Sequence, residues 1–509
     1  MLQVLWGVGG MLFVLAVAWL LSVDRKRIRF RTVSLALLVQ VAFAVIVLYI
    51  PAGRTALTAL TEAVQAVINS SADGIEFLFG PILPDEGPVF AFQVLPVIVF
   101  FASLTAVLYH VGLLQLVTRW IGGALAKILG TERAESMNAA ANIFVGQTEA
   151  PLVIRPYIKS MSPSEVFAVM AGGLTTVAGS VLVGYALLGA NLEYLIAASF
   201  MAAPAGLLMA KMLVPAGAMA HIGPHAGETS DGRPATERSE RTAERQPAAP
   251  PDARAGEDEQ RGAGEQAAPS DQHESRGVGT RLAAAFRRGA RRGATMEGRD
   301  ELVRRARSED VPVGGERGPR AAGEDADGPD ESEDEQQPPV NVIDAAARGA
   351  SDGLSLALNV GAMLLAFISL IALANIILGG IGGLFGYGDL TVEEILGYVF
   401  APVMAAVGVP LPEAVDAGSF LGQKVILNEF VAFSDFAPNA ENYSDKAQAV
   451  ITFALTGFAN LGSLAILLGG LGGIAPTQRG VIAQLGLRAV LAGTLGNLLS
   501  AAIAGILIG

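Results

Sequence analysis

Eight long apolar stretches follow one another along this 509-residue chain, and they constrain its fold more than any other feature. They cover roughly residues 2–23, 33–50, 91–118, 163–188, 193–217, 355–382, 448–474 and 480–508. A helix rises about 1.5 Å per residue, so each stretch can cross the roughly 30 Å of hydrocarbon in a bilayer. We therefore predict an all-α polytopic membrane protein with about eight transmembrane helices, embedded in the lipid bilayer.

A polar insert separates the fifth stretch from the sixth. Residues 221–340 hold 26 Asp and Glu, 18 Arg, no Lys and a single aromatic residue, so they account for −8 of the net charge of −13. Such a composition buries too little apolar surface to offset the entropy of ordering. We expect the insert, residues 218–340, to be disordered. Within it, residues 281–292 either form a basic amphipathic helix on anionic lipid or, in the reading we favour, stay solvated.

Lys and Arg in the short connections predict the orientation, because cytoplasmic loops are enriched in them. Basic residues occur at 25–31, between 119 and 159 and at 479–488, whereas 189–192 and 379–423 have none. We expect a multi-pass protein of the cytoplasmic (inner) membrane. Both termini then lie outside, and the 218–340 insert is cytoplasmic.

Two stretches between the apolar segments resist assignment as spans. Residues 130–162 and 411–436 are of intermediate polarity, and each precedes an apolar stretch interrupted by Gly and small polar residues. The interruptions match in sequence, which places Thr176 opposite Asn460. In the orientation above, 130–162 enters from inside and 411–436 from outside. We therefore predict two re-entrant helical hairpins in an inverted repeat with discontinuous helices, an architecture of many secondary transporters.

This organisation predicts four parts of the chain. Residues 1–90 supply N-terminal scaffold helices and an external interfacial segment. Residues 91–217 form the first inverted repeat and 341–509 the second, on either side of the 218–340 insert.

Each predicted hairpin carries a carboxylate in an apolar setting, Glu149 in the first and Glu429 in the second. An ionised side chain at the bilayer centre costs at least about 3 kcal/mol, which a polar ligand or a cation would offset. The structural alternative is that Glu149 pairs with Arg155 and Glu429 with Lys424, each pair closing its hairpin. Two such carboxylates, on inverted hairpins beside matched broken helices, favour a functional site.

Other polar residues accompany the carboxylates. Gln147 and Thr148 offer hydrogen-bond donors and acceptors at the tip of the first hairpin. In the third motif, residues 457–463, glycines permit the helix to unwind. Asn460 and Ser463 there either face a ligand or form hydrogen bonds between helices, and for Ser463 alone the second interpretation is the stronger.

The chain contains no cysteine, and the only histidine outside the insert is His110. A membrane-embedded enzyme would need a nucleophile with its base, or a metal cluster, and these residues supply neither. We therefore do not expect an enzyme.

Three motifs resemble those of the concentrative nucleoside transporter family, the NupC-like sodium/nucleoside cotransporters. They are Gly-Gln-Thr-Glu-Ala-Pro at 146–151, Gly-x-Lys-x-x-x-Asn-Glu-Phe-Val-Ala-Phe at 422–433 and Gly-Phe-Ala-Asn-x-x-Ser at 457–463. The likeness covers nearly the whole chain outside residues 221–340. It implies cation-coupled nucleoside uptake by alternating access in a homotrimer, with no cofactor and no nucleic-acid partner.

Carried over residue by residue, the resemblance also implies the site. The nucleobase would be contacted by Gln147, Thr148 and Glu149. The ribose hydroxyls would be held by Glu429, Asn460 and Ser463, with Phe458 as an apolar surface. A sodium ion, the coupling ion, would lie between the first hairpin and the interrupted fourth stretch, at Asn142, Val145, Thr176 and Val177.

Two alternatives remain beside this interpretation. Some bacterial relatives are proton-coupled, although the oxygens of Asn142 and Thr176 favour sodium. A nucleoside-gated pore or sensor would instead use the insert as its output element.

Overall fold

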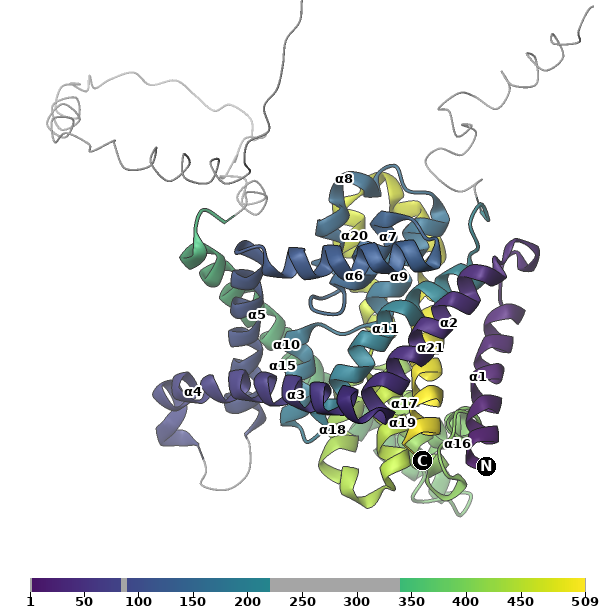
Figure 1. Ribbon diagram of the computed structural model, residues 1–509. Helices are drawn as coiled ribbons and strands as arrows, with labels where there is room; N and C mark the ends of the chain where they lie inside the picture. Colours follow the sequence, from purple (N-terminus) through teal and green to yellow (C-terminus); the bar gives the residue numbers. More distant parts are fainter. Residues whose placement is uncertain (1, 84–88, 220–338, 509) are drawn as a thin grey trace, which may run out of the picture. The chain divides into compact units, whose positions relative to one another are not determined.

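The computed structural model describes residues 2–83, 89–219 and 339–508, and within these ranges every regular element is helical (Figure 1). The helices are α1 (Leu2–Leu20), α2 (Phe30–Ala44), α3 (Pro51–Ser70), α4 (Ala72–Phe79), α5 (Leu95–His110), α6 (Leu113–Leu129), α7 (Arg133–Ala141), α8 (Arg155–Ile158), α9 (Pro163–Thr175), α10 (Gly179–Leu187), α11 (Leu192–Leu213), α15 (Val342–Gly383), α16 (Val392–Ala406), α17 (Ala414–Ile426), α18 (Glu429–Phe436), α19 (Asp445–Leu455), α20 (Leu461–Ile474) and α21 (Arg479–Leu507). Nearly all of the predicted insert, including 281–292, lies outside the described residues.

The described helices include six segments long and apolar enough to cross a membrane. They are Phe30–Tyr49, Phe90–His110, Pro163–Leu187, Leu192–Leu213, Val342–Gly383 and Pro476–Leu507. Val4–Leu20 and Leu461–Ile474 are shorter apolar helices. Every predicted apolar stretch is therefore represented, and the prediction of a helical polytopic membrane protein is confirmed.

The third apolar stretch is shorter than the predicted 91–118. Helix α5 ends at His110, and Gly112 then adopts a φ of 88°, which glycine reaches without steric cost. Figure 1 shows α6 leaving the end of α5 at a steep angle. Because α6 is itself rich in leucine, apolarity alone did not reveal the turn between α5 and α6. The Trp120 side chain of α6 is exposed.

The most enclosed helices are α9, α10 and α11. Other helices bury 94% of the Pro163–Leu187 window and 89% of the Leu192–Leu213 window, but only 17% of Phe90–His110 and 11% of Val342–Gly383. The last two segments, α5 and α15, pack along each other (Figure 1). Gly349 and Gly353 of α15 lie directly on the backbone and Cβ atoms of α5, as small residues allow in lipid. Their outward apolar faces remain available to lipid or to another protein.

Two helices of the chain are interrupted. Helix α9 ends at Thr175 and α10 begins at Gly179, with Thr176 in extended conformation (φ −102°, ψ 172°). Helix α19 ends at Leu455 and α20 begins at Leu461, with Asn460 likewise extended (φ −143°, ψ 170°). Both breaks fall where the sequence predicts them.

Each interrupted helix is preceded by a short helix pair. In the first pair, α7 contacts the 3-10 helix η5 (Ala150–Ile154), which continues into α8. In the second pair, α17 contacts α18 across the two residues Leu427 and Asn428. Asn428 caps α18 by accepting a hydrogen bond from the Val431 amide at 2.9 Å.

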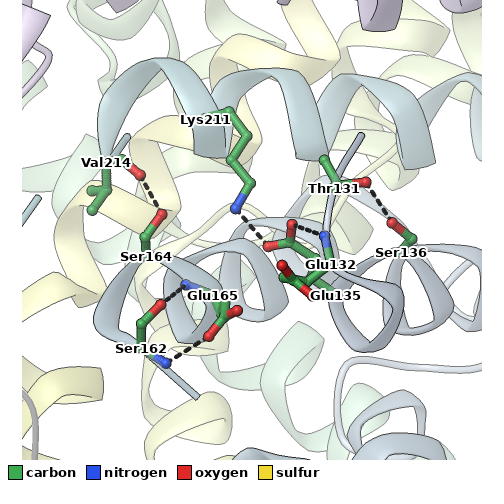
Figure 2. Close-up of polar contacts among 9 residues, drawn as sticks. All are labelled: Thr131, Glu132, Glu135, Ser136, Ser162, Ser164, Glu165, Lys211 and Val214. Atoms are coloured by element: carbon green, nitrogen blue, oxygen red, sulfur yellow. Dashed lines mark hydrogen bonds and ion pairs between the residues drawn. The ribbon is translucent and has the colours of Figure 1, made fainter. Parts of the chain in front are cut away.

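A polar cluster ties the beginning of α7 to α9 and α11, as Figure 2 shows. The Lys211 ammonium of α11 forms a buried ion pair of 2.6 Å with Glu135 of α7. The second Glu135 oxygen accepts the Glu132 amide at 2.9 Å, closing a capping box. The pKa of the Glu135 carboxyl lies above its ordinary value because burial outweighs the opposing effect of the Lys211 ammonium. Ser162 and Glu165 form the matching capping box at the start of α9.

Candidate functional site

The two helix breaks meet at one asparagine of α21. The Asn497 amide nitrogen donates to the carbonyl oxygens of Thr175 at 2.7 Å and Thr456 at 2.6 Å. Thr175 is the last residue of α9, and Thr456 directly follows α19. The Phe458 amide also donates to the Thr176 carbonyl at 3.1 Å. Carbonyl groups that the interrupted helices leave unpaired are thereby satisfied without water.

Glycines of α21 make this meeting possible. A Cβ at Gly493 would lie 2.9 Å from both the Ala459 Cβ and the Leu174 carbonyl, one on each break. A Cβ at Gly496 would lie 2.9 Å from the Thr175 Cγ2. Both positions are too tight for any larger residue, so α21 supports both breaks through its backbone.

Glu429 is buried at the first residue of α18, and two side chains hold its carboxylate. The Tyr185 hydroxyl of α10 donates to Oε1 at 3.0 Å, and the Asn460 amide donates to Oε2 at 2.7 Å. Asn460 Oδ1 in turn accepts the Ser463 amide at 2.7 Å. The structure thus brings three predicted residues together, Glu429, Asn460 and Ser463, and adds Tyr185. Phe458 lies partly buried in the same break.

Lys424 is fully buried, but it does not form the ion pair with Glu429 that we considered from the sequence. Its ammonium donates to the Ala454 carbonyl at 2.7 Å and to Asn497 Oδ1 at 2.8 Å. Lys424 therefore joins the second helix pair to the asparagine that holds both breaks. The simple structural alternative for Glu429 is wrong, because tyrosine and asparagine hold that carboxylate.

In the first helix pair, three buried amide oxygens lack a hydrogen-bond donor among the described residues. They are Asn138 Oδ1 within α7, Asn142 Oδ1 at its end, and Gln147 Oε1. The side chains of Asn142 and Gln147 lie against Gly173 of α9, where a Cβ would be 2.9 Å from the Gln147 Cβ and 3.8 Å from Asn142 Oδ1. An unpaired buried acceptor costs about 1–3 kcal/mol, which a ligand at these oxygens would offset.

Thr176 lies at the first break, directly after α9. Its hydroxyl donates to the carbonyl of Gly172, one turn earlier, at 3.0 Å, so its oxygen keeps lone pairs for another partner. Val177, the next residue, and Val145, which follows α7, are buried at 0% and 8% exposure. Four oxygen-bearing positions expected to hold a cation therefore lie at the end of α7 and at the first break.

Thr148 and Glu149 occupy the tip of the first helix pair. Thr148 packs against α20, where a Cβ at Gly470 would lie 2.9 Å from its Cγ2. The Glu149 carboxylate folds back over Gly146, leaving no room for a Cβ there, and the residue as a whole is exposed. Glu149 thus differs in its surroundings from the buried Glu429: part of the residue is exposed, while its carboxylate lies against Gly146.

Sequence reasoning missed Tyr185 and Asn497. Each is a polar residue in a largely apolar helix that carries other polar residues too, a pattern that in a membrane protein marks either packing or function. Neither belongs to a motif, so only their contacts show that they act on the site.

A cavity of about 640 Å³ lies beside α17 and α18 and extends to α15 and α16. Its lining includes Glu393, Asp416 and Asp435, together with Gln423 and Val431. Gln423 donates to Asp435 at 2.7 Å. None of the predicted site residues lines this cavity.

Apolar helices broken at mid-length, with buried carboxylate and amide groups at the breaks, are typical of membrane transporters. Family models match the chain over three ranges: "Na+ dependent nucleoside transporter N-terminus" at residues 9–82, "Nucleoside recognition" at 91–192 and "Na+ dependent nucleoside transporter C-terminus" at 311–505. The chain belongs to the concentrative nucleoside transporter family, the Na+-dependent nucleoside transporters.

Relatives and solved structures agree with this membership. The chain is 44% identical to an uncharacterized transporter of Bacillus subtilis, YutK, over 100% of both chains. It is 39% identical to the nucleoside permease NupC of Helicobacter pylori, over 99% of this chain and 98% of the relative. The structure of CNTnw in an inward-facing substrate-bound state has 43% identity and a TM-score of 0.74, covering 99% of this chain and 98% of that one. An outward-facing CNTnw variant also gives a TM-score of 0.74, at 42% identity.

Proposed function

We propose that this protein takes up nucleosides into the cell, each cycle being driven by sodium entering with the nucleoside. The observation that carries the proposal is the pair of buried amide oxygens of Asn142 and Gln147, which have no donor among the described residues, together with the carboxylate–amide set at Glu429 and Asn460. The Phe458–Thr176 hydrogen bond joins the two breaks beside which these groups lie. The Asn142 oxygen suits a cation, and the Gln147 oxygen suits a hydrogen-bond donor on the nucleobase. Membership in a Na+-dependent family supports the choice of ion.

The nucleoside would be held at both ends. Gln147, Thr148 and Glu149 offer donors and acceptors to the edge of the base, and the Glu149 residue is exposed. At the other end, Glu429, Asn460 and Ser463 would receive the ribose hydroxyls, and Phe458 would cover the sugar or base with an apolar ring. The Tyr185 and Asn460 hydrogen bonds fix the Glu429 carboxylate in place before the sugar arrives.

The residues at the first break fit a sodium ion. Asn142 Oδ1 is buried and unpaired among the described residues, and the Thr176 hydroxyl oxygen retains acceptor capacity. Backbone carbonyls of Val145 and Val177 would complete a set made only of oxygens, which suits a hard monovalent cation. The end of α7 adds the negative pole of a helix.

The two helix pairs would enter the membrane as re-entrant hairpins from opposite faces, residues 130–162 from inside and 411–436 from outside. Residues 91–217 and 341–509 would then form an inverted repeat, with 1–90 as scaffold helices and both termini outside. The 218–340 insert would be cytoplasmic, and the protein would lie in the cytoplasmic membrane. Exposed apolar faces of α5 and α15 leave surface for a homotrimer, which native mass spectrometry would detect.

Alternating access would follow from movement of the site-bearing helices as a unit. Sodium at Asn142 would order the first hairpin and so complete the base site. The loaded unit would then expose the nucleoside to the cytoplasm, with the ion gradient driving uphill uptake.

Uptake by proteoliposomes tests the proposal. With an inward sodium gradient, we expect labelled uridine or adenosine to accumulate, and unlabelled nucleosides to compete. Accumulation driven by a proton gradient without sodium would instead establish the proton-coupled alternative. No uptake with either ion would overturn the proposal.

The same assay separates a transporter from a sensor. Deletion of residues 225–335 should leave most of the uptake, because none of the proposed site residues lies there. A pore would show flux that runs only down the nucleoside gradient, whatever the sodium gradient.

A further inference from the structure

One buried polar group beside the proposed sodium site has no role in the function proposed above. Asn138 Oδ1, on α7, is fully buried and has no hydrogen-bond donor among the described residues. Its Nδ2 points to the Val169 carbonyl of α9 at 3.4 Å. Rotating the amide by 180° would place Oδ1 against that carbonyl, so the orphan atom is the oxygen.

Asn138 and Asn142 are one helical turn apart and lie on the same face of α7. Both amides lie around Gly172: a Cβ there would be 3.6 Å from Asn138 Nδ2 and 3.8 Å from Asn142 Nδ2. Asn142 Nδ2 also donates to the Asn138 carbonyl at 2.9 Å. The absent side chain of Gly172 therefore lets both amide groups pack against α9, and each carries an oxygen without a donor in the described chain.

The same face of α7 continues to Glu135, one turn before Asn138. Glu135 belongs to the polar cluster of Figure 2, where it pairs with Lys211. A cavity of about 120 Å³ opens at this cluster. Its charged lining consists of three carboxylates and three cations, Glu132, Glu135, Glu165, Arg27, Arg29 and Lys211. At about 1.5 Å of rise per residue, Glu135 and Asn142 lie roughly 10 Å apart along the helix, with Asn138 between them.

We propose that Asn138 Oδ1 is a second, transient oxygen site for the coupling cation, through which sodium passes from Asn142 to the cavity at the base of α7 and so to the cytoplasm. This inference rests on the proposed sodium-coupled uptake. It assigns the step that releases the ion, whereas Asn142 and Thr176 hold it. Successive oxygens one turn apart let the ion exchange partners without crossing a bare apolar gap.

Comparing net uptake with nucleoside exchange isolates the release step. Net uptake under an inward sodium gradient requires the ion to leave in every cycle. Exchange of labelled for unlabelled nucleoside, with saturating sodium on both sides, lets the ion stay bound. For Asn138→Leu, we expect net uptake to fall about tenfold or more, since the ion loses its intermediate partner, while exchange stays within about twofold of the unmodified protein.

Two further variants complete the design. Asn138→Ala also lacks the oxygen but introduces no bulk, so it should show the same split even if the leucine variant folds poorly. Thr61→Val removes another buried hydroxyl oxygen without a donor in the described chain, on α3, and should change neither rate. Sodium-dependent nucleoside binding at equilibrium should persist in Asn138→Ala, because the Asn142 site is intact.

The outcomes distinguish a release site from a packing role. If net uptake and exchange fall together, Asn138 only supports the packing of α7, and the inference is overturned. If both rates equal those of the unmodified protein, the inference is overturned as well. If the unmodified protein shows no sodium-coupled uptake, the proposed function itself fails, which is a different result.

Discussion

The backbone amide of Phe458 donates a hydrogen bond to the carbonyl oxygen of Thr176 at 3.1 Å, across 282 positions of sequence. One residue belongs to the break expected at the ribose and the other to the break expected at the cation. Asn497 bridges the same two breaks through Thr175 and Thr456. The two halves of the site are thus joined by one backbone hydrogen bond and by the Asn497 side chain.

Neutralising Glu429 should abolish transport. Glu429→Gln keeps the shape but turns one acceptor oxygen into a donor that faces either the Tyr185 hydroxyl or the Asn460 amide. We expect uptake to fall at least about tenfold, since a buried charged hydrogen bond is worth about 1.5–3 kcal/mol. Glu441→Gln, the same change at an exposed position, should transport normally. Normal uptake by Glu429→Gln would remove this carboxylate from the site.

Removing the Asn142 oxygen should weaken sodium dependence selectively. In Asn142→Leu, the concentration of sodium that gives half-maximal uptake should rise about tenfold or more, because the buried unpaired oxygen is lost. The variant should fold, since that oxygen has no protein partner among the described residues to lose. A sodium titration of uptake checks this, and an unchanged half-saturation would contradict the assigned cation site.

Replacing Asn497 should damage stability as well as transport. Asn497→Leu leaves two break carbonyls without their donor and Lys424 without one of its acceptors. We expect a loss of about 3 kcal/mol or more in unfolding free energy, visible as a lower Tm in detergent. Thr494→Val on the same helix removes only a bond to Val490 in its own helix and should cost little. Equal Tm values for the two variants would contradict the bridging role.

Glu149 should act on the ligand and not on the fold. Because Glu149 is exposed, Glu149→Gln is expected to leave the Tm unchanged while it lowers the apparent affinity for nucleoside. Competition binding with uridine and adenosine measures the change. Glu62→Gln, an exposed carboxylate of α3, serves as the control and should bind normally.

The sequence predicted those parts of the site that belong to short local motifs. Gly-rich interruptions predicted both breaks, and the cost of a charge in lipid drew attention to Glu149 and Glu429. It did not predict their different surroundings, one exposed and one buried, because burial depends on which helix packs alongside. The ion pair considered between Lys424 and Glu429 was wrong for the same reason. Glu429 is the nearest carboxylate along the sequence, but the Lys424 ammonium instead contacts Asn497 of α21.

Lengths of elements were less predictable than their existence. The third stretch continues in leucines past His110, so only the backbone geometry at Gly112 reveals where α5 stops. Asn497 and Tyr185 carry no local signature, since the sequence around a polar residue in a largely apolar helix does not tell whether its side chain packs or binds.

The Asn497 bridge has a thermodynamic consequence. Two binding events that share one hydrogen-bonded support are linked, and this linkage is reciprocal. If bound sodium raises the affinity for nucleoside by some factor, bound nucleoside raises the affinity for sodium by the same factor. A substitution that loosens the bridge would then reduce both factors together, and the protein would leak ions or nucleoside separately. Stoichiometric coupling in this chain would thus depend on a side chain that touches neither cargo.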